Sequence, residues 1–297
     1  MSWELAARAA ALSSRLALHV RRGMGARTGD RRFPGRPQPW GIEMEAYGAY
    51  TPGDDLRHLD WSALARLDVL LMRRYIAERE VRFDLLVDTS ASMGLPAGDG
   101  KLAVARELAM ALAWVALASN DAVRVGLLGG GGAPIVSPVY RRRASARPIA
   151  ERLTGAVAAG ALDLGAALEA HARRYPAPGA ALVISDLMAE PASVERGVLA
   201  LRARRYEVVL LQVIGRGELE PEVAGGVLED VESGARHPIA VTPAVRTRYR
   251  TLLAAHLAAL GAVAERTRTT YARLSSDASV AEFVTVELGR LGLVRRR

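Results

Sequence analysis

The sequence contains no cysteine, so it can form neither a disulfide nor a thiolate zinc site, and it offers no thiol nucleophile. No apolar run reaches the roughly 18 residues that a membrane-spanning helix requires. Residues 1–24 also lack the uninterrupted apolar block of a secretory signal peptide. Together these absences predict a cytoplasmic protein that works in a reducing compartment.

Lysine is almost absent as well. Lys101 is the only lysine among 40 basic residues, so arginine carries the net charge of +8. Arginines cluster in several places, for example at residues 141–143 and 295–297. Such clusters are typical of nucleic acid or anionic lipid binding. Here they are scattered and lack the interleaved aromatic side chains on which bases stack. We predict no specific nucleic acid partner, and an arginine-driven nucleic acid or lipid binder remains an alternative.

The rest of the composition is that of a folded protein. Half of the 297 residues are hydrophobic, which is enough to form one large domain or two. The sequence pattern changes near residue 82, and we predict two parts. Residues 1–81 would hold an N-terminal helix, an irregular segment and a small extended or β segment, and residues 82–297 would form an α/β domain.

In the N-terminal part, residues 2–22 carry apolar side chains at helical spacing and predict a helix. Residues 23–55 are rich in glycine, proline and arginine, and they predict mainly irregular chain. A short helix is expected after Asp54 and Asp55, whose carboxylates can cap it, and a strand is expected over residues 69–76.

From residue 82, apolar strands alternate with helical stretches. Strands are expected at residues 83–88, 123–128, 181–186 and 207–214, with further strand candidates at 135–139, 227–232 and 238–241. Helices are expected at residues 102–119, 147–157, 164–174, 193–204, 244–267 and 280–291. This alternation predicts a doubly wound α/β domain with a mostly parallel sheet and helices on both faces. Ligands of such domains bind at the carboxyl ends of the strands.

The motif Asp88-Thr89-Ser90-Ala91-Ser92 follows the first of these strands directly. One carboxylate and two hydroxyls on a tight loop are oxygen ligands of the kind that Mg²⁺, or Mn²⁺, prefers. Asp186 ends a later strand and would accept hydrogen bonds from metal-bound waters. With a single carboxylate bound, the cation would keep positive charge and an open position for an acidic side chain of a partner.

This motif resembles the metal-ion-dependent adhesion site of von Willebrand factor A domains. Together with the stretch Gly53-Asp54-Asp55-Leu56-Arg57-His58-Leu59-Asp60-Trp61, it is similar to the bacterial family called domain of unknown function 58. The resemblance runs over about residues 41–186 and continues more weakly to residue 291. It implies a von Willebrand A-like fold and an association with MoxR-type AAA+ ATPases, which are thought to mature or activate other protein complexes.

The sequence departs from the family pattern in the second loop of the site. The family reads Gly-Gly-Thr-x-Leu there, with the threonine hydroxyl on the metal, whereas alignment on Ala167 and Leu168 places Leu162 at that position. Leucine cannot ligate a metal, and the adjacent Asp163 is a possible replacement. The alternative is a site without metal, in which Ser90 and Ser92 cap backbone groups and Asp88 accepts from strand-end amides.

The stretch from Gly53 to Trp61 allows two interpretations. Asp54, Asp55, Arg57 and Asp60 are candidates for a partner-binding surface. The same residues also fit ordinary structural roles better: a turn, an aspartate cap, an arginine ion pair and a tryptophan packed in the core.

We therefore predict a non-enzymatic protein–protein interaction module that binds an acidic partner residue through Mg²⁺. The partner implied by the resemblance is a MoxR-type ATPase or its client. A metal-assisted phosphate-ester hydrolase is the main alternative, because phosphoryl transfer also uses Mg²⁺ at acidic strand ends. The first loop lacks a second carboxylate and the chain lacks a clear general base, which disfavours that alternative.

Overall fold

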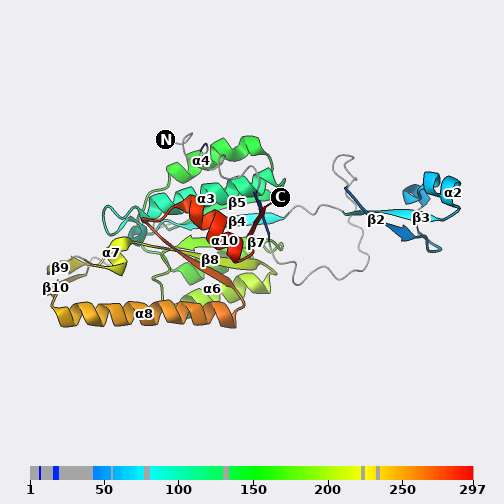
Figure 1. Cartoon of the computed structure of the whole chain (residues 1–297). Helices are drawn as coiled ribbons and strands as arrows, with labels where there is room; N and C mark the ends of the chain where they lie inside the picture. The colour runs from blue at the N-terminus through cyan, green and yellow to red at the C-terminus, as the bar shows by residue number, and fades with distance from the viewer. Residues whose placement is uncertain are drawn as a thin grey trace. The chain divides into compact units, whose positions relative to one another are not determined.

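The computed structural model describes residues 7, 16–19, 43–54, 56–76, 81–129, 134–221, 225–231 and 235–296. The chain forms two compact units, one made of residues 27–80 and the other of the remaining residues (Figure 1). Leu16–Leu18, which the sequence assigns to the N-terminal part, therefore belong to the larger unit.

Within the described residues, the larger unit is built on a six-stranded sheet with the order β11-β8-β7-β4-β5-β6. The parallel strands are β4 (Arg82–Asp88), β5 (Ala122–Leu128), β7 (Ala180–Ser185), β8 (Glu207–Ile214) and β11 (Thr270–Ser275). The edge strand β6 (Ile135–Val136) is antiparallel to β5. From β4 the chain builds the sheet first on one side and then on the other. Ligands of doubly wound sheets bind where the strand order reverses in this way, which here is the carboxyl end of β4 beside β7.

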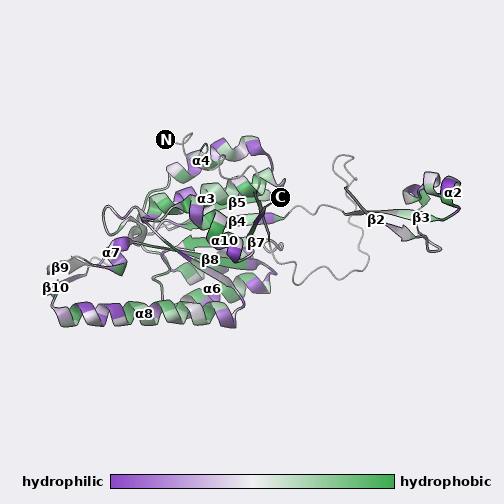
Figure 2. Ribbon diagram, in the orientation of Figure 1, coloured by the Kyte–Doolittle hydropathy of each residue, from purple (hydrophilic) through white to green (hydrophobic). Residues whose placement is uncertain are grey.

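Helices cover both faces of this sheet, as the alternating pattern predicts. On one face lie α3 (Lys101–Ala118) and α4 (Ala146–Thr154), and on the other lie α5 (Leu164–Arg174) and α6 (Pro191–Ala203). Side chains of β4 alternate between two cores, Leu85 and Val87 facing α3 and Leu86 facing the opposite layer. The central strands are largely hydrophobic in Figure 2. The predicted doubly wound α/β fold is confirmed.

The remaining elements of the larger unit surround this three-layer body. They are α7 (Arg216–Leu219), the antiparallel hairpin β9 (Gly226–Glu229) and β10 (Arg236–Ile239), α8 (Pro243–Arg266), α9 (Val280–Glu282), a π-helical turn (Phe283–Glu287), α10 (Leu288–Arg290), and the short 3₁₀ turns Ala91–Gly94 and Arg143–Ser145. Strand β12 (Val294–Arg296) pairs with β1 (Leu16–Leu18). No helix in the described part of the chain is long and apolar enough to cross a membrane.

The smaller unit is a β-hairpin with a helical connection. Strands β2 (Glu43–Ala49) and β3 (Leu71–Ile76) are antiparallel, and a 3₁₀ turn (Leu56–His58) and α2 (Trp61–Leu67) lie between them in the chain. The helix predicted after Asp54 and Asp55 is present, and so is the strand predicted at residues 69–76. Asp60 caps the helix, since its Oδ1 accepts from the backbone amides of Ser62 and Ala63.

Local spacing gave a wrong or incomplete prediction at two places. Leu16–Leu18 form a strand, not part of a helix; Ala7 is helical, and the rest of the predicted helix at 2–22 lies outside the described residues. Glu43–Ala49 form a strand inside a segment expected to be mainly irregular. The basic residues Val294–Arg296, for which no element was predicted, also form a strand. In each case the conformation depends on pairing with a distant strand, which the local spacing of apolar residues cannot indicate.

A buried charge network near the amino end of β4 was not foreseen. The carboxylate of Asp84 is fully buried and contacts His171 Nε2 at 2.9 Å, Tyr206 Oη at 2.9 Å and Arg82 Nε at 3.1 Å. Burial alone would raise the pKa of Asp84, but the hydrogen bond with His171 and the charge of Arg82 lower it below its usual range. The network joins β4 to α5 and to Tyr206, which directly precedes β8, at the end of the sheet away from Asp88.

Candidate functional site

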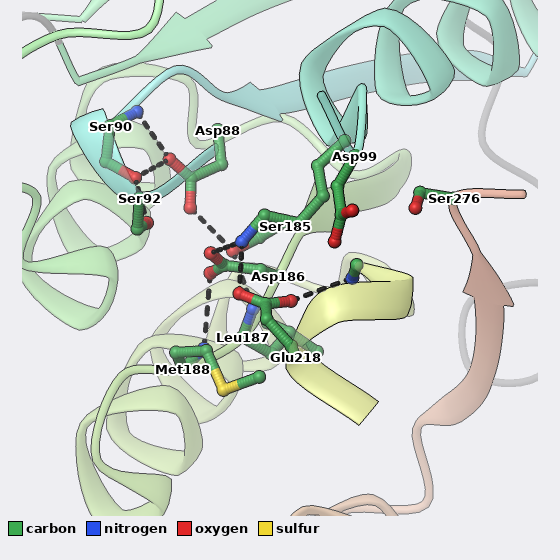
Figure 3. Close-up of polar contacts among 12 residues, drawn as sticks. Asp88, Ser90, Ser92, Asp99, Ser185, Asp186, Leu187, Met188, Glu218 and Ser276 are labelled. Carbon is green, nitrogen blue, oxygen red and sulfur yellow. Dashed lines mark hydrogen bonds and ion pairs between the residues drawn. The ribbon is translucent and has the colours of Figure 1, made fainter. Parts of the chain in front are cut away.

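Two buried aspartates lie at the carboxyl ends of adjacent strands. Asp88 is the last residue of β4, and Asp186 directly follows β7, which pairs with β4. Each residue is 3% exposed. Figure 3 shows Asp88 at the end of β4, Ser90 and Ser92 on the loop that follows it, and Ser185 and Asp186 nearby at the end of β7. The structure thus brings together the predicted ligands and the predicted outer carboxylate.

The first loop turns tightly around the carboxylate of Asp88. Its Oδ1 accepts from the backbone amide of Ser90 at 2.8 Å and from the Ser90 hydroxyl at 2.6 Å. The Ser90 and Ser92 hydroxyl oxygens are 3.0 Å apart. One carboxylate and two hydroxyls therefore converge on a single point of the loop, as the Asp-x-Ser-x-Ser spacing predicts.

The second oxygen of Asp88 has a partner that the sequence analysis missed. The Ser185 hydroxyl donates to Asp88 Oδ2 at 2.6 Å and accepts from the Leu187 amide at 3.0 Å. The sequence feature that could have indicated this role of Ser185 is its position at a strand end, immediately before Asp186. Burial raises the pKa of Asp88, and the charge of Asp186 raises it further, against the hydrogen bonds from Ser185 and Ser90. A cation beside Asp88 would relieve the cost of keeping this carboxylate ionised.

The sole lysine of the chain is the second residue that the sequence analysis missed. Lys101 is the first residue of α3, and its side chain is completely buried. Its ammonium group lies 2.9 Å from Asp186 Oδ2 and also donates to Glu218 Oε1. Burial raises the pKa of Glu218, while the hydrogen bond from Lys101 lowers it. The signal was compositional, because Lys101 is the only lysine in a chain whose other 39 lysine or arginine residues are arginines.

A cavity of about 210 Å³ opens at this end of the sheet. Its polar lining, among the described residues, consists of Asp88, Ser90, Ser92, Ser185, Asp186 and Asp230. Its apolar lining includes Leu162, Leu164 and Met188. No histidine, lysine or tyrosine is among the described residues that line it. The apolar wall limits the water around the polar groups and so strengthens their electrostatic interactions.

The second loop contributes an apolar wall and no ligand. Leu162 lines the cavity at the position where the family pattern has threonine. Asp163 is absent from the cavity lining in the described structure: it caps α5, with Oδ1 accepting from the Ala166 amide and from the Ser193 hydroxyl, both at 3.0 Å. Its side chain is 58% exposed. The hydrogen bond from Ala166 lowers the pKa of Asp163, in keeping with a capping role.

The donor set fits a hard divalent cation in part. Asp88, Ser90 and Ser92 offer oxygens at one edge of the cavity, and Mg²⁺ commonly uses one or two carboxylates together with waters. No group of three or more metal-ligating histidine, aspartate or glutamate side chains occurs among the described residues. A cation at this loop would therefore need the two serine hydroxyls as ligands besides Asp88. Asp186 could offer it only one unpaired oxygen at most, because Oδ2 is already paired with Lys101.

The predicted partner-binding residues lie on the smaller unit. Asp54 is exposed, and its carboxylate closes a turn by accepting from the Thr51 amide and hydroxyl. Asp60 is 4% exposed and receives a hydrogen bond from Tyr47 besides capping α2, so it has the structural role. Arg57 is exposed, and Asp55 lies outside the described residues. Trp61 is 61% exposed, which contradicts the core packing expected for it.

Sequence comparison identifies the family. Residues 46–259 match the family model described as "Protein of unknown function DUF58". This chain belongs to the DUF58 family. Relatives of this DUF58 protein include the uncharacterized proteins Rv1480 of Mycobacterium tuberculosis (strain H37Rv) and Mb1516 of Mycobacterium bovis. Each is 34% identical over 217 residues, which cover 70% of this chain and 67% of the relative. The predicted family membership is confirmed.

Solved structures with similarity to this DUF58 protein include a conserved hypothetical protein BatB from Bacteroides thetaiotaomicron. It is 16% identical, with a TM-score of 0.41, and the match covers 71% of this chain and 98% of BatB. The SpRpn10 VWA domain is 9% identical, with a TM-score of 0.41, and the match covers 70% of this chain and 95% of the SpRpn10 domain.

Proposed function

We propose that this DUF58 protein is a non-enzymatic protein-interaction module that holds Mg²⁺, or Mn²⁺, on Asp88, Ser90 and Ser92 and captures an acidic side chain of a partner. The observation that carries this proposal is the convergence of one buried carboxylate and two hydroxyls on the loop after β4, at the edge of a cavity. These are hard oxygen donors at the strand order reversal, where doubly wound domains bind ligands.

The charge of the donor set supports binding of an acidic partner. Asp88 is the only carboxylate of the Asp88–Ser92 motif, and Ser90 and Ser92 add neutral oxygens. A divalent cation held in this way keeps net positive charge and open coordination positions. Asp186 would orient its bound waters, and the apolar side chains Leu162 and Met188 would shield the ion pair from solvent.

The partner class comes from the family resemblance. We propose a MoxR-type AAA+ ATPase, or a client of one, as the protein that supplies the acidic side chain. The non-enzymatic assignment is supported by the cavity lining, which, in the described part of the chain, offers no histidine, lysine or tyrosine, while Asp88 and Asp186 are already engaged with Ser185 and Lys101.

Calorimetric titration of the full chain with Mg²⁺ tests the cation site. Wild type should bind one equivalent, and Asp88→Asn should show no binding, because it removes the only charged ligand of the loop while preserving side-chain shape. Asp163→Asn is the matched control: it removes a nearby carboxylate that caps α5, and asparagine caps equally well. Binding by Asp88→Asn equal to that of wild type would contradict the proposal.

A further inference from the structure

The smaller unit exposes more bulky apolar side chains than it buries. Among its described residues, the buried apolar side chains are those of Leu59 and Met72. Five bulky side chains in and beside α2 are each at least 42% exposed, namely Leu56, Trp61, Leu67, Val69 and Leu70. A two-stranded hairpin is only marginally stable in water by itself, and clustered exposed apolar side chains mark interaction sites. The smaller unit therefore needs a cover over α2.

The five exposed side chains can share one interface. They fall within residues 56–70, and α2, with seven residues, is about 10 Å long. Figure 1 shows α2 at the closed end of the β2–β3 hairpin. An interface of standard size takes about 800 Å² from each partner, which extends well beyond the length of α2. A single surface can therefore cover all five side chains.

The charges beside these side chains are self-complementary. Arg66 lies in the last turn of α2, and Asp68 ends the helix in the left-handed conformation; both are exposed. Residues two apart on a helix do not face each other, and within the described part of the chain neither side chain has an ion pair or a hydrogen bond. In a twofold interface, each residue meets its counterpart's partner twice. Arg66 of each copy can therefore pair with Asp68 of the other copy.

The net charge of the smaller unit also fits a second copy of the chain. Residues 27–80 hold nine arginines and nine aspartates or glutamates, so the net charge of +8 lies entirely in the larger unit. Two smaller units can meet without net repulsion, whereas two larger units repel each other. A second copy is also present wherever the chain is made, so it can cover the apolar side chains permanently.

We propose that the smaller unit is a homodimerisation element, in which α2 and residues 67–70 of one copy pack on the same surface of a second copy about a twofold axis. Trp61 and Leu67 supply the apolar contact, and two ion pairs between Arg66 and Asp68 fix the orientation. This inference is independent of the cation site, because no residue that lines the cavity at Asp88 takes part in the contact.

Sedimentation equilibrium of the full chain tests the dimer. Wild type should have twice the mass of one chain at micromolar concentration. Trp61→Ala should raise the dissociation constant of the dimer at least about tenfold, as truncation of a buried aromatic anchor does. The matched control is Leu199→Ala on α6 of the larger unit, because Leu199 is similarly exposed, at 52%. This control should dimerise like wild type.

Charge reversal distinguishes a twofold contact from any other cover. Arg66→Asp and Asp68→Arg should each weaken the homodimer at least about tenfold, because each places like charges opposite one another. The conformation of Asp68 tolerates arginine, since Arg205 and Arg268 adopt similar positive φ angles in this chain. An equimolar mixture of the two variants should form heterodimers, because opposite charges then face each other again.

Four results would each overturn the inference. They are a monomeric wild type, undiminished dimerisation of Trp61→Ala or of either charge-reversed variant, equal weakening by Leu199→Ala, and a mixture of the two charge-reversed variants that stays monomeric. The mixture also controls for misfolding, because a variant whose smaller unit had unfolded would not regain association on meeting its counterpart.

Discussion

Replacing Lys101 with methionine is expected to lower the free energy of unfolding by about 3–5 kcal/mol, the usual cost of removing one partner of a buried ion pair. Methionine matches the length of the lysine stem and so preserves packing. It would leave the carboxylates of Asp186 and Glu218 buried together without their shared cation. Urea denaturation of wild type and variant at neutral pH measures the difference.

Two companion variants make the lysine experiment specific. Combining Lys101→Met with Asp186→Asn and Glu218→Gln removes the uncompensated charges and should recover much of the lost stability. Arg147→Met breaks the exposed pair with Glu151, in which the arginine side chain is 80% exposed, and should leave stability unchanged within error. A Lys101→Met protein as stable as wild type would show that this ammonium does not hold the site together.

Replacing Asp88 with asparagine is expected to stabilise the cation-free protein by about 0.5–2 kcal/mol, the range that single stabilising substitutions commonly give. The wild-type carboxylate is buried close to Asp186, and both effects raise its pKa. The same substitution removes the charged ligand, so saturating Mg²⁺ should raise the melting temperature of wild type and leave that of Asp88→Asn unchanged. Calorimetric melting with Mg²⁺ and with chelator measures both effects.

The advantage of Asp88→Asn should depend on pH in a defined direction. The pKa of Asp88 in the folded protein lies above its ordinary value of 3.8. The contribution of such a carboxyl group to stability is fully present at pH values below 3.8, and it is lost as the pH rises through the pKa of the folded state. Wild type therefore bears the cost of the ionised carboxylate at neutral pH, and asparagine does not. The stability difference between the two proteins should shrink as the pH is lowered from about 8 to about 4. A difference that grows on acidification would contradict the burial of an ionised Asp88.

The features predicted from sequence are those encoded locally. Continuous apolar runs such as Ala181 to Ile184 predict buried parallel strands, and the structure places this one in β7, at the centre of the sheet. An aspartate at the end of such a strand must fall at the carboxyl edge, so the convergence of Asp88 and Asp186 followed from topology. The Asp-x-Ser-x-Ser loop needed only its own short spacing to bring its oxygens together.

The features missed depend on distant parts of the chain. Strand β11 was overlooked although Ala272–Ser275 alternates apolar and polar residues, because this run is short and the strand is completed only by pairing with β8. Lys101 and Glu218 are 117 residues apart in sequence, and Asp230 lies on a hairpin whose position no local pattern reports. Asp84 occupies a buried strand position where a carboxylate is tolerated because His171 and Tyr206 reach it from distant parts of the chain and Arg82 pairs with it from the same strand.

The most direct test of the central claim is affinity capture from native lysate with the tagged full chain, in Mg²⁺ and in chelator, using wild type beside Asp88→Asn. A cation-dependent adhesion site predicts a protein partner that wild type retains in Mg²⁺ and loses in chelator, and that Asp88→Asn does not retain in either condition. Recovery of the same partner in all four lanes would contradict the account, because the interaction would then require neither the cation nor the Asp88 carboxylate.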